Sequence, residues 1–107
     1  MAYFEKDFHV SKDDTKILNL LKPRKGIVRA VLDTDTYNEI DDQFALVQMM
    51  LSNNRIKVEG IYAAPFSMNE RADNPEKGME LSYDEILRLL ERIKVSHENF
   101  VFKGVKQ

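Results

Sequence analysis

The chain of 107 residues contains no cysteine, which excludes a disulfide framework, a thiolate metal site and a cysteine nucleophile. It also lacks any apolar run near the ~18 residues of a membrane-spanning helix, and its charged N-terminus has no signal-peptide core. The 16 basic residues nearly balance the 18 acidic ones, so the net charge gives no reason to expect nucleic acid or an anionic membrane as a partner. We therefore expect a cytoplasmic protein that binds neither.

The composition is that of an ordinary globular protein, with 43% hydrophobic and 32% charged residues. A chain of this length forms one domain, or one piece of a larger domain. We expect an N-terminal leader, residues 1–26, followed by an α/β domain, residues 27–107. In the leader, Ser11 is placed to cap a short helix that Pro23 stops.

Three segments of the domain have the pattern of strands. Residues 27–32 are nearly all apolar and rich in β-branched side chains, which is typical of a strand buried on both faces of a parallel sheet. Residues 56–63 and 100–103 predict a second and a third strand.

Two helices are predicted between these strands. From Asp41 onward apolar residues cover most of a helix surface, Asp41 is placed to cap that helix, and Asn53 and Asn54 end it. A long loop then runs up to Ser82, where the capping box Ser82 to Glu85 predicts the start of the second helix. Strands and helices in this order predict part of a doubly wound parallel sheet, which binds ligands beyond the carboxyl ends of its strands.

A cluster of carboxylates lies at the end of the first strand and the start of the first helix. Like charges so close together raise one another's pKa or recruit a cation, and hard oxygen ligands favour calcium or magnesium. Capping and the helix dipole account for Asp41 and Asp42. They do not account for Asp33 and Asp35, because Ser or Asn could end an apolar strand equally well. The sequence therefore predicts a functional site here.

Spacing distinguishes two motifs that could include this cluster. An EF-hand loop starting at Asp33 would need glycine in place of Asn38 and glutamate in place of Phe44, so it is excluded. A haloacid-dehalogenase-type phosphatase also has a strand ending in D-x-D, and its first aspartate attacks phosphorus. That pattern would need Thr or Val in place of Tyr37, and it has no use for Asp41 and Asp42. The phosphatase remains an alternative.

The segment VLDTDTYNEIDDQFAL, residues 31–46, closely resembles the N-terminal signature of the inosine-uridine-preferring nucleoside hydrolases. The usual form of that signature is D-x-D-P-G-x-D-D after a strand and before an apolar helix. Here the span between the acidic pairs, Thr36 to Ile40, is two residues longer. The resemblance extends over roughly residues 27–104, and only the aspartate motif is highly specific.

The resemblance implies calcium as cofactor, a ribonucleoside as substrate and a role for each aspartate. Asp35 would be a calcium ligand and the general base that deprotonates the attacking water. Asp42 would be a second ligand, Asp41 would bind a ribose hydroxyl, and Asp33 would support Asp35 by hydrogen bonding. The family also presents an asparagine to the ribose from the loop after the second strand, where Asn69 lies.

The resemblance is to the N-terminal portion of the family only. In that family the acid that protonates the leaving base, where it is a histidine, comes from late in the chain, together with another calcium-binding aspartate. His9 and His97 are not placed to replace it. We therefore expect a truncated or incomplete hydrolase with weak calcium affinity, partnered by the rest of a longer polypeptide or by other copies of itself. A non-catalytic α/β module that oligomerises or binds a partner remains the alternative.

Overall fold

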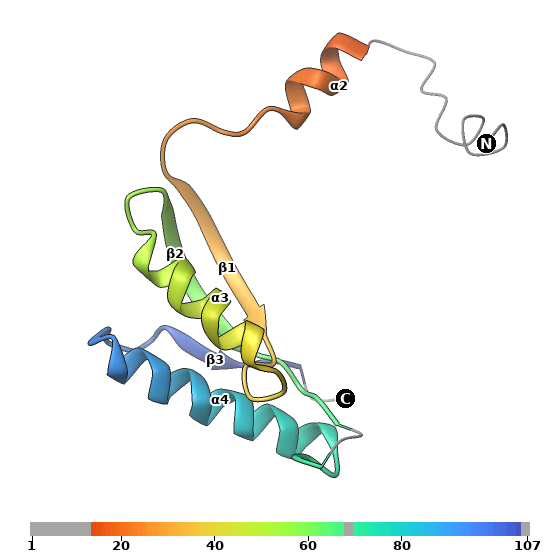
Figure 1. Cartoon of the computed structure of the whole chain (residues 1–107), viewed down its shortest axis with the longest axis vertical. Coiled ribbons are helices and arrows are strands. Elements are labelled where there is room, and N and C mark those ends of the chain that lie inside the picture. Colours follow the sequence, from red (N-terminus) through yellow and green to blue (C-terminus); the bar gives the residue numbers. More distant parts are fainter. Residues whose placement is uncertain (1–13, 68–69, 106–107) are drawn as a thin grey trace, which may run out of the picture.

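The computed structural model describes residues 14–67 and 70–105. It has an α/β architecture in which strands and helices alternate after a leader helix, as predicted (Figure 1). The elements in chain order are α2 (Asp14–Leu21), β1 (Val28–Thr34), α3 (Ile40–Leu51), β2 (Ile56–Ala63), α4 (Pro75–Arg92) and β3 (Val101–Lys103).

The three strands form one parallel sheet in the order β1-β2-β3. The predicted bounds of β2 are confirmed, and β3 begins one residue later than predicted. The β1–β2 pairing contains an irregularity between Ala30 and Val31, where β2 has the extra residue Glu59. Because β1 pairs with β2 on one side only, it forms an edge of the sheet.

Both long helices cover the same face of this sheet (Figure 1). Right-handed crossovers that step in one direction across a parallel sheet place their helices on one face. The hydrophobic core lies between that face and the helices, and its fully buried members include Leu46, Ile61, Met79, Ile86 and Leu90.

The predicted burial of the first strand on both faces is wrong. Side chains along β1 alternate between half-buried and exposed positions, and Val31 is 57% exposed. No helix of the described residues covers the second face of the sheet, because α3 and α4 share the first (Figure 1). On this open face the rings of Tyr62 and Phe102 stack at a centroid distance of 5.1 Å, and both remain partly exposed.

The predicted start of the second helix at Ser82 is also wrong. The helix α4 begins at Pro75, and the Asn74 side chain caps it by accepting a hydrogen bond of 2.9 Å from the Lys77 backbone N–H. An Asn–Pro pair favours this start, because asparagine is a strong N-cap and proline has the backbone angle of the first helical position. Ser82 is instead buried within the helix, and its hydroxyl has no hydrogen-bond partner among the described residues.

The earlier start of α4 depends on a close approach between the helix and the loop after β2. A Cβ added to Gly78 would lie 1.9 Å from the backbone oxygen of Phe66. Only glycine fits there, because any side chain would overlap the backbone of this loop.

The leader helix predicted before Pro23 is present as α2, whereas its predicted cap, Ser11, lies outside the described residues. None of the α2 residues is buried, and the helix stands away from the sheet beyond the amino end of β1 (Figure 1). Among the described residues, no helix combines the length and apolar character needed to cross a membrane.

Candidate functional site

The site is built on a turn that follows the carboxyl end of β1. Asp35 and Asn38 close this turn twice, because the Asn38 backbone N–H donates to the Asp35 carbonyl at 2.8 Å and the Asn38 side-chain amide donates to Asp35 Oδ2 at 2.9 Å. Arg71, from the segment before α4, donates to the Asn38 carbonyl oxygen. The span between the acidic pairs is therefore held in place, and it fixes one oxygen of the Asp35 carboxylate.

The helix α3 begins directly after this turn. Its N-cap is Glu39, which has extended backbone and makes no side-chain capping hydrogen bond. The predicted capping role of Asp41 is wrong, because Ile40 is already helical and both Asp41 and Asp42 lie in the first turn of the helix. In that position each carboxylate interacts favourably with the positive end of the helix dipole.

Asp35 and Asp42 are brought together across the start of the helix. Their carboxyl groups are in hydrogen-bond contact, and this contact, together with burial, raises the pKa of Asp42 from its ordinary 3.8 to about 6. A hydrogen bond from Thr34 opposes the rise, whereas the negative charges of Asp35 and Asp41 add to it. Two carboxylates in contact repel each other when both are ionised, so the pair favours a shared proton or a bound cation.

Two buried threonine hydroxyl groups lie beside this pair and contact each other. Thr34 and Thr36 are both buried, and the Thr36 hydroxyl is 3.1 Å from the Thr34 hydroxyl. Thr34 is the last residue of β1. It belongs to the more buried of the two alternating sets of β1 side chains, so its side chain lies on the helix-covered face beside the first turn of α3. Neither threonine was predicted as a site residue, although their positions flanking Asp35 in the sequence could have indicated them.

The other predicted site residues differ in how they lie relative to the Asp35–Asp42 pair. Asp33 is exposed and pairs in register with Tyr62, which places it on the open face of the sheet. Asp41 is exposed on α3 and acts on Asp42 through its charge. Asn69 falls outside the described residues. His97 precedes β3, at the amino edge of the sheet and opposite the aspartates.

A hard cation suits the donors of this site in kind, since carboxylate and hydroxyl oxygens are the ligands that calcium and magnesium prefer. The number of acidic ligands is small. Within residues 14–67 and 70–105, no three side chains of His, Cys, Asp or Glu are grouped so that they could hold a metal ion. Calcium takes about 6–8 oxygen ligands, so Asp35 and Asp42 would form one part of a calcium site.

A surface cavity of about 250 Å³ adjoins the same turn. It combines an aromatic side chain, an apolar side chain and charges of both signs, and neither Asp35 nor Asp42 is among its lining residues, which are Tyr37, Glu39, Ile40, Gln43 and Arg71. Two of its lining residues, Glu39 and Ile40, directly precede Asp41 and Asp42 in the chain.

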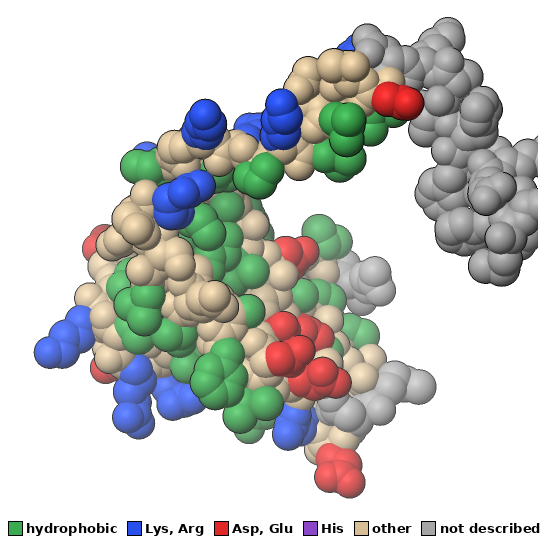
Figure 2. All heavy atoms as spheres, turned by 45° about the horizontal axis from the view of Figure 1, so that its top comes forward, with side chains coloured by type: hydrophobic (Ala, Val, Ile, Leu, Met, Phe, Trp, Pro, Cys, Tyr) green, Lys and Arg blue, Asp and Glu red, His purple; other side chains and the backbone are tan. Residues whose placement is uncertain are grey.

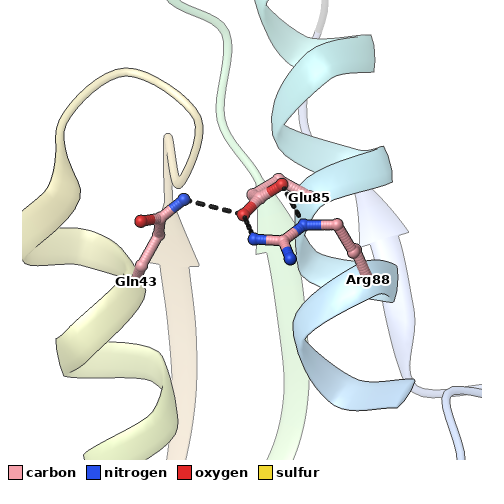
Figure 3. A network of polar contacts seen from close by, with 3 residues as sticks. All are labelled: Gln43, Glu85 and Arg88. Carbon is pink, nitrogen blue, oxygen red and sulfur yellow. Dashed lines mark hydrogen bonds and ion pairs between the residues drawn. The ribbon is translucent and has the colours of Figure 1, made fainter. Parts of the chain in front are cut away.

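A partly buried hydrogen bond joins α3 to α4 at Gln43, the residue directly after Asp42 (Figure 3). Gln43 of α3 donates to Glu85 of α4 at 2.7 Å, and Arg88 donates to both oxygens of the same carboxylate. Glu85 is only 6% exposed. Glu85 was predicted to belong to a capping box, whereas its carboxylate connects the two helices and so holds the start of α3 in position.

The geometry thus brings Asp35 and Asp42 together, orders the turn between them and places Asp33 on the other face of the sheet. Such a pair can hold a proton or share a hard cation, and either carboxylate can accept a proton from water. Comparison of the chain with protein-family models, with curated proteins and with solved structures finds no match.

Proposed function

We propose that this chain carries part of the active site of a nucleoside N-ribohydrolase, an enzyme that cleaves the N-glycosidic bond of a ribonucleoside with water. The contact between Asp35 and Asp42 carries the proposal. These two residues belong to separate acidic pairs of the D-x-D and D-D motif, and the proposed chemistry needs one carboxylate from each pair beside the same ion. The proposal includes the wider fold, in which the observed sheet would be one half of a doubly wound arrangement.

The position of Asp33 favours this function over the phosphatase alternative. A phosphatase of that class would use the first aspartate of D-x-D as its nucleophile. Asp33 lies within β1 on the open face, whereas Asp35 and Asp42 meet beyond the end of the strand. Ligands of parallel sheets bind beyond the carboxyl ends of the strands, where Asp35 lies.

In the proposed reaction Asp35 accepts a proton from the attacking water. The water oxygen forms a bond to the anomeric carbon as the bond from that carbon to the base nitrogen breaks, and the departing base takes up a proton from an acid. Asp42 would hold the same ion as Asp35, and Asp41 would bind a ribose hydroxyl. When bound, calcium would lower the pKa of the water. The negative charge of the cluster also stabilises positive charge that develops on the sugar.

The proposed site needs oxygen ligands in addition to Asp35 and Asp42, and it needs an acid for the leaving base. Asn69 remains a proposed contact to the ribose. Further ligands could come from residues outside the described ranges, from a longer polypeptide or from another copy of the chain. The proposal therefore predicts weak calcium binding for the chain by itself.

Release of ribose from inosine and uridine, measured by a reducing-sugar assay in the presence of calcium, tests the proposal. We expect slow release that Asp35→Asn abolishes, because this substitution removes the base but preserves the size of the side chain. The control Asp84→Asn changes an exposed aspartate on α4 and should leave the rate unchanged. An absence of ribose at high enzyme and calcium concentrations would contradict hydrolase activity in this chain.

A second candidate is a non-catalytic module that uses the same carboxylates for loose cation binding. The observation that favours it is the absence of a third acidic ligand among the described residues. It predicts that calcium stabilises the fold while the reducing-sugar assay detects nothing. A magnesium-dependent release of phosphate that Asp33→Asn abolishes would instead support the phosphatase.

A further inference from the structure

Among the described residues, no strand pairs with the outer edge of β1. The Val28 N–H donates to the Arg55 carbonyl and the Thr34 carbonyl accepts from the Ala64 N–H, so both residues direct their backbone groups toward β2. Backbone groups alternate sides along a strand, and the extra residue of the irregularity lies in β2 rather than β1. The N–H and C=O groups of Arg29, Val31 and Asp33 therefore point to the free edge.

The sequence of β1 is complementary to itself around Val31. In an antiparallel pair of two β1 strands centred on this residue, Val31 would face Val31 of the second copy. Arg29 would then face Asp33 of the second copy, and the same contact would occur again on the other side of the symmetry axis. These are the three residues whose backbone groups point outward, so each pair would also exchange backbone hydrogen bonds. On the helix-covered face, Ala30 would face Leu32.

The charges on the open face also favour a second copy. Arg29 contacts Glu59 at 2.8 Å and Lys57 lies 3.5 Å from the same glutamate, so two basic side chains share one acidic partner. Asp33 of the second copy would provide the missing negative charge. Opposite charges that face each other across strands stabilise a sheet, and like charges in the same position destabilise it.

The charges flanking β1 select the antiparallel direction. Three basic residues, Lys22, Arg24 and Lys25, precede the strand, whereas the carboxylates of the candidate site follow it. Figure 2 shows a group of acidic side chains well apart from the basic side chains beside the leader. Antiparallel pairing places the basic end of one strand beside the acidic end of the other, whereas parallel pairing would place like charges together.

We propose that two copies of this chain form a symmetric dimer in which their β1 strands pair antiparallel, centred on Val31. The pairing joins the two three-stranded sheets into one continuous sheet with all of the helices α3 and α4 on the same face. A dimer with two-fold symmetry uses the same surface of both copies, and the self-complementary order of Arg29, Val31 and Asp33 meets this requirement. It also removes the exposed strand edge, which would otherwise promote aggregation.

A single cysteine reports the register of this pair, because the chain has none of its own. In the proposed dimer the two Val31 Cα atoms lie about 5.5 Å apart, which is within the range that a disulfide spans. Val31→Cys should therefore give a covalent dimer under mild oxidation with oxidised glutathione. The matched control is Ile27→Cys, since Ile27 is 64% exposed and Val31 57%. The two Ile27 residues would lie roughly 25 Å apart, so this variant should remain uncrosslinked.

Charge reversal tests the same interface without a covalent bond, with sedimentation velocity as the readout. Arg29→Asp should raise the dissociation constant of the dimer about tenfold or more, because both cross-strand pairs change from attraction to repulsion. Adding Asp33→Arg to that variant restores opposite charges and should restore the dimer. Val31→Lys, which places two ammonium groups at the symmetry axis, should give a folded monomer by circular dichroism.

The proposed dimer would be overturned if the wild-type chain stays monomeric at every concentration measured by sedimentation velocity. Equal crosslinking of the Ile27→Cys and Val31→Cys variants would also overturn it. Failure of the doubly reversed variant to dimerise, with its circular dichroism unchanged, would also overturn the register. None of these measurements depends on hydrolase activity, so the dimer and the hydrolase activity can fail separately. The dimer uses the β1 edge at which a doubly wound sheet would continue, so the dimer and that wider fold exclude each other in the same molecule.

Discussion

Replacing Asp42 with asparagine should stabilise the protein at neutral pH. In the folded chain, contact with Asp35 and burial raise the pKa of Asp42 to about 6, from an ordinary 3.8. Ionised Asp42 is therefore held at a cost beside a second carboxylate. Asparagine removes that charge and provides an amide that can donate a hydrogen bond to Asp35. The expected gain in the free energy of unfolding equals the electrostatic cost of holding ionised Asp42 beside Asp35.

The direction of the pH dependence follows from the raised pKa. The folded state binds the Asp42 proton more tightly than the unfolded state does, so the wild type is favoured most below pH 3.8 and loses stability as the pH rises from 3.8 to about 6. At about 1.4 kcal/mol per pH unit, the loss has an upper limit of about 3 kcal/mol. Screening by solvent at this half-buried position reduces the expected value to about 1–2 kcal/mol.

Urea unfolding monitored by circular dichroism, at neutral pH and below pH 3.8, measures this difference. Asp42→Asn should raise the free energy of unfolding by about 1–2 kcal/mol at neutral pH and by much less in acid. Asp84→Asn, at an exposed position of α4, should change it little at either pH. A loss of stability in the Asp42 variant at neutral pH would refute the inference that the two carboxylates repel each other in the folded protein.

Three further substitutions test the parts of the fold that position the site. Gly78→Ala should lower the free energy of unfolding by about 3 kcal/mol or more, because its Cβ would overlap the Phe66 backbone, whereas Lys77→Ala one residue earlier should have a small effect in the same urea titration. Asn74→Ala should cost about 1 kcal/mol through loss of the cap of α4, with fraying detectable as faster amide hydrogen exchange in its first turn. Glu85→Ala should lower the free energy of unfolding by about 2–4 kcal/mol, because it removes the hydrogen bond between α3 and α4 and leaves the Gln43 amide without this partner. An unchanged melting temperature in thermal unfolding would contradict the role of this contact.

The sequence was sufficient to predict the features that depend on local pattern. The segment Ile56 to Ala63 predicts β2 with its observed bounds, because it is rich in β-branched and aromatic residues and its polar Lys57 and Glu59 alternate with apolar residues. The acidic pairs around the end of β1 predicted a functional cluster, and the contact between Asp35 and Asp42 lies there. This much follows from topology, since a parallel strand and the helix after it necessarily meet at the carboxyl edge of the sheet.

Features that depend on tertiary contacts could not be predicted in the same way. The apolar residues of β1 resemble those of a strand covered on both faces, yet the helices of the described chain lie on one face only, so Val31 is exposed. The S-x-x-E pattern at Ser82 matches a capping box, but Asn74 and Pro75 start the helix earlier and bury Ser82 and Glu85 within it. The contact of Arg71 with the Asn38 carbonyl joins residues distant in sequence, and neither residue type indicates it.

Calcium titration by isothermal calorimetry, in two buffers with different ionisation enthalpies, tests the central claim that Asp35 and Asp42 together form a hard-cation site. Near pH 6 the wild type should bind calcium weakly and release protons, because the contact with Asp35 raises the pKa of Asp42 to about 6 and a bound cation displaces the proton that Asp42 then carries. Asp35→Asn and Asp42→Asn should each abolish this binding, whereas Asp84→Asn should retain it. Calcium binding that persists unchanged in both site variants, or its absence from the wild type, would contradict the claim.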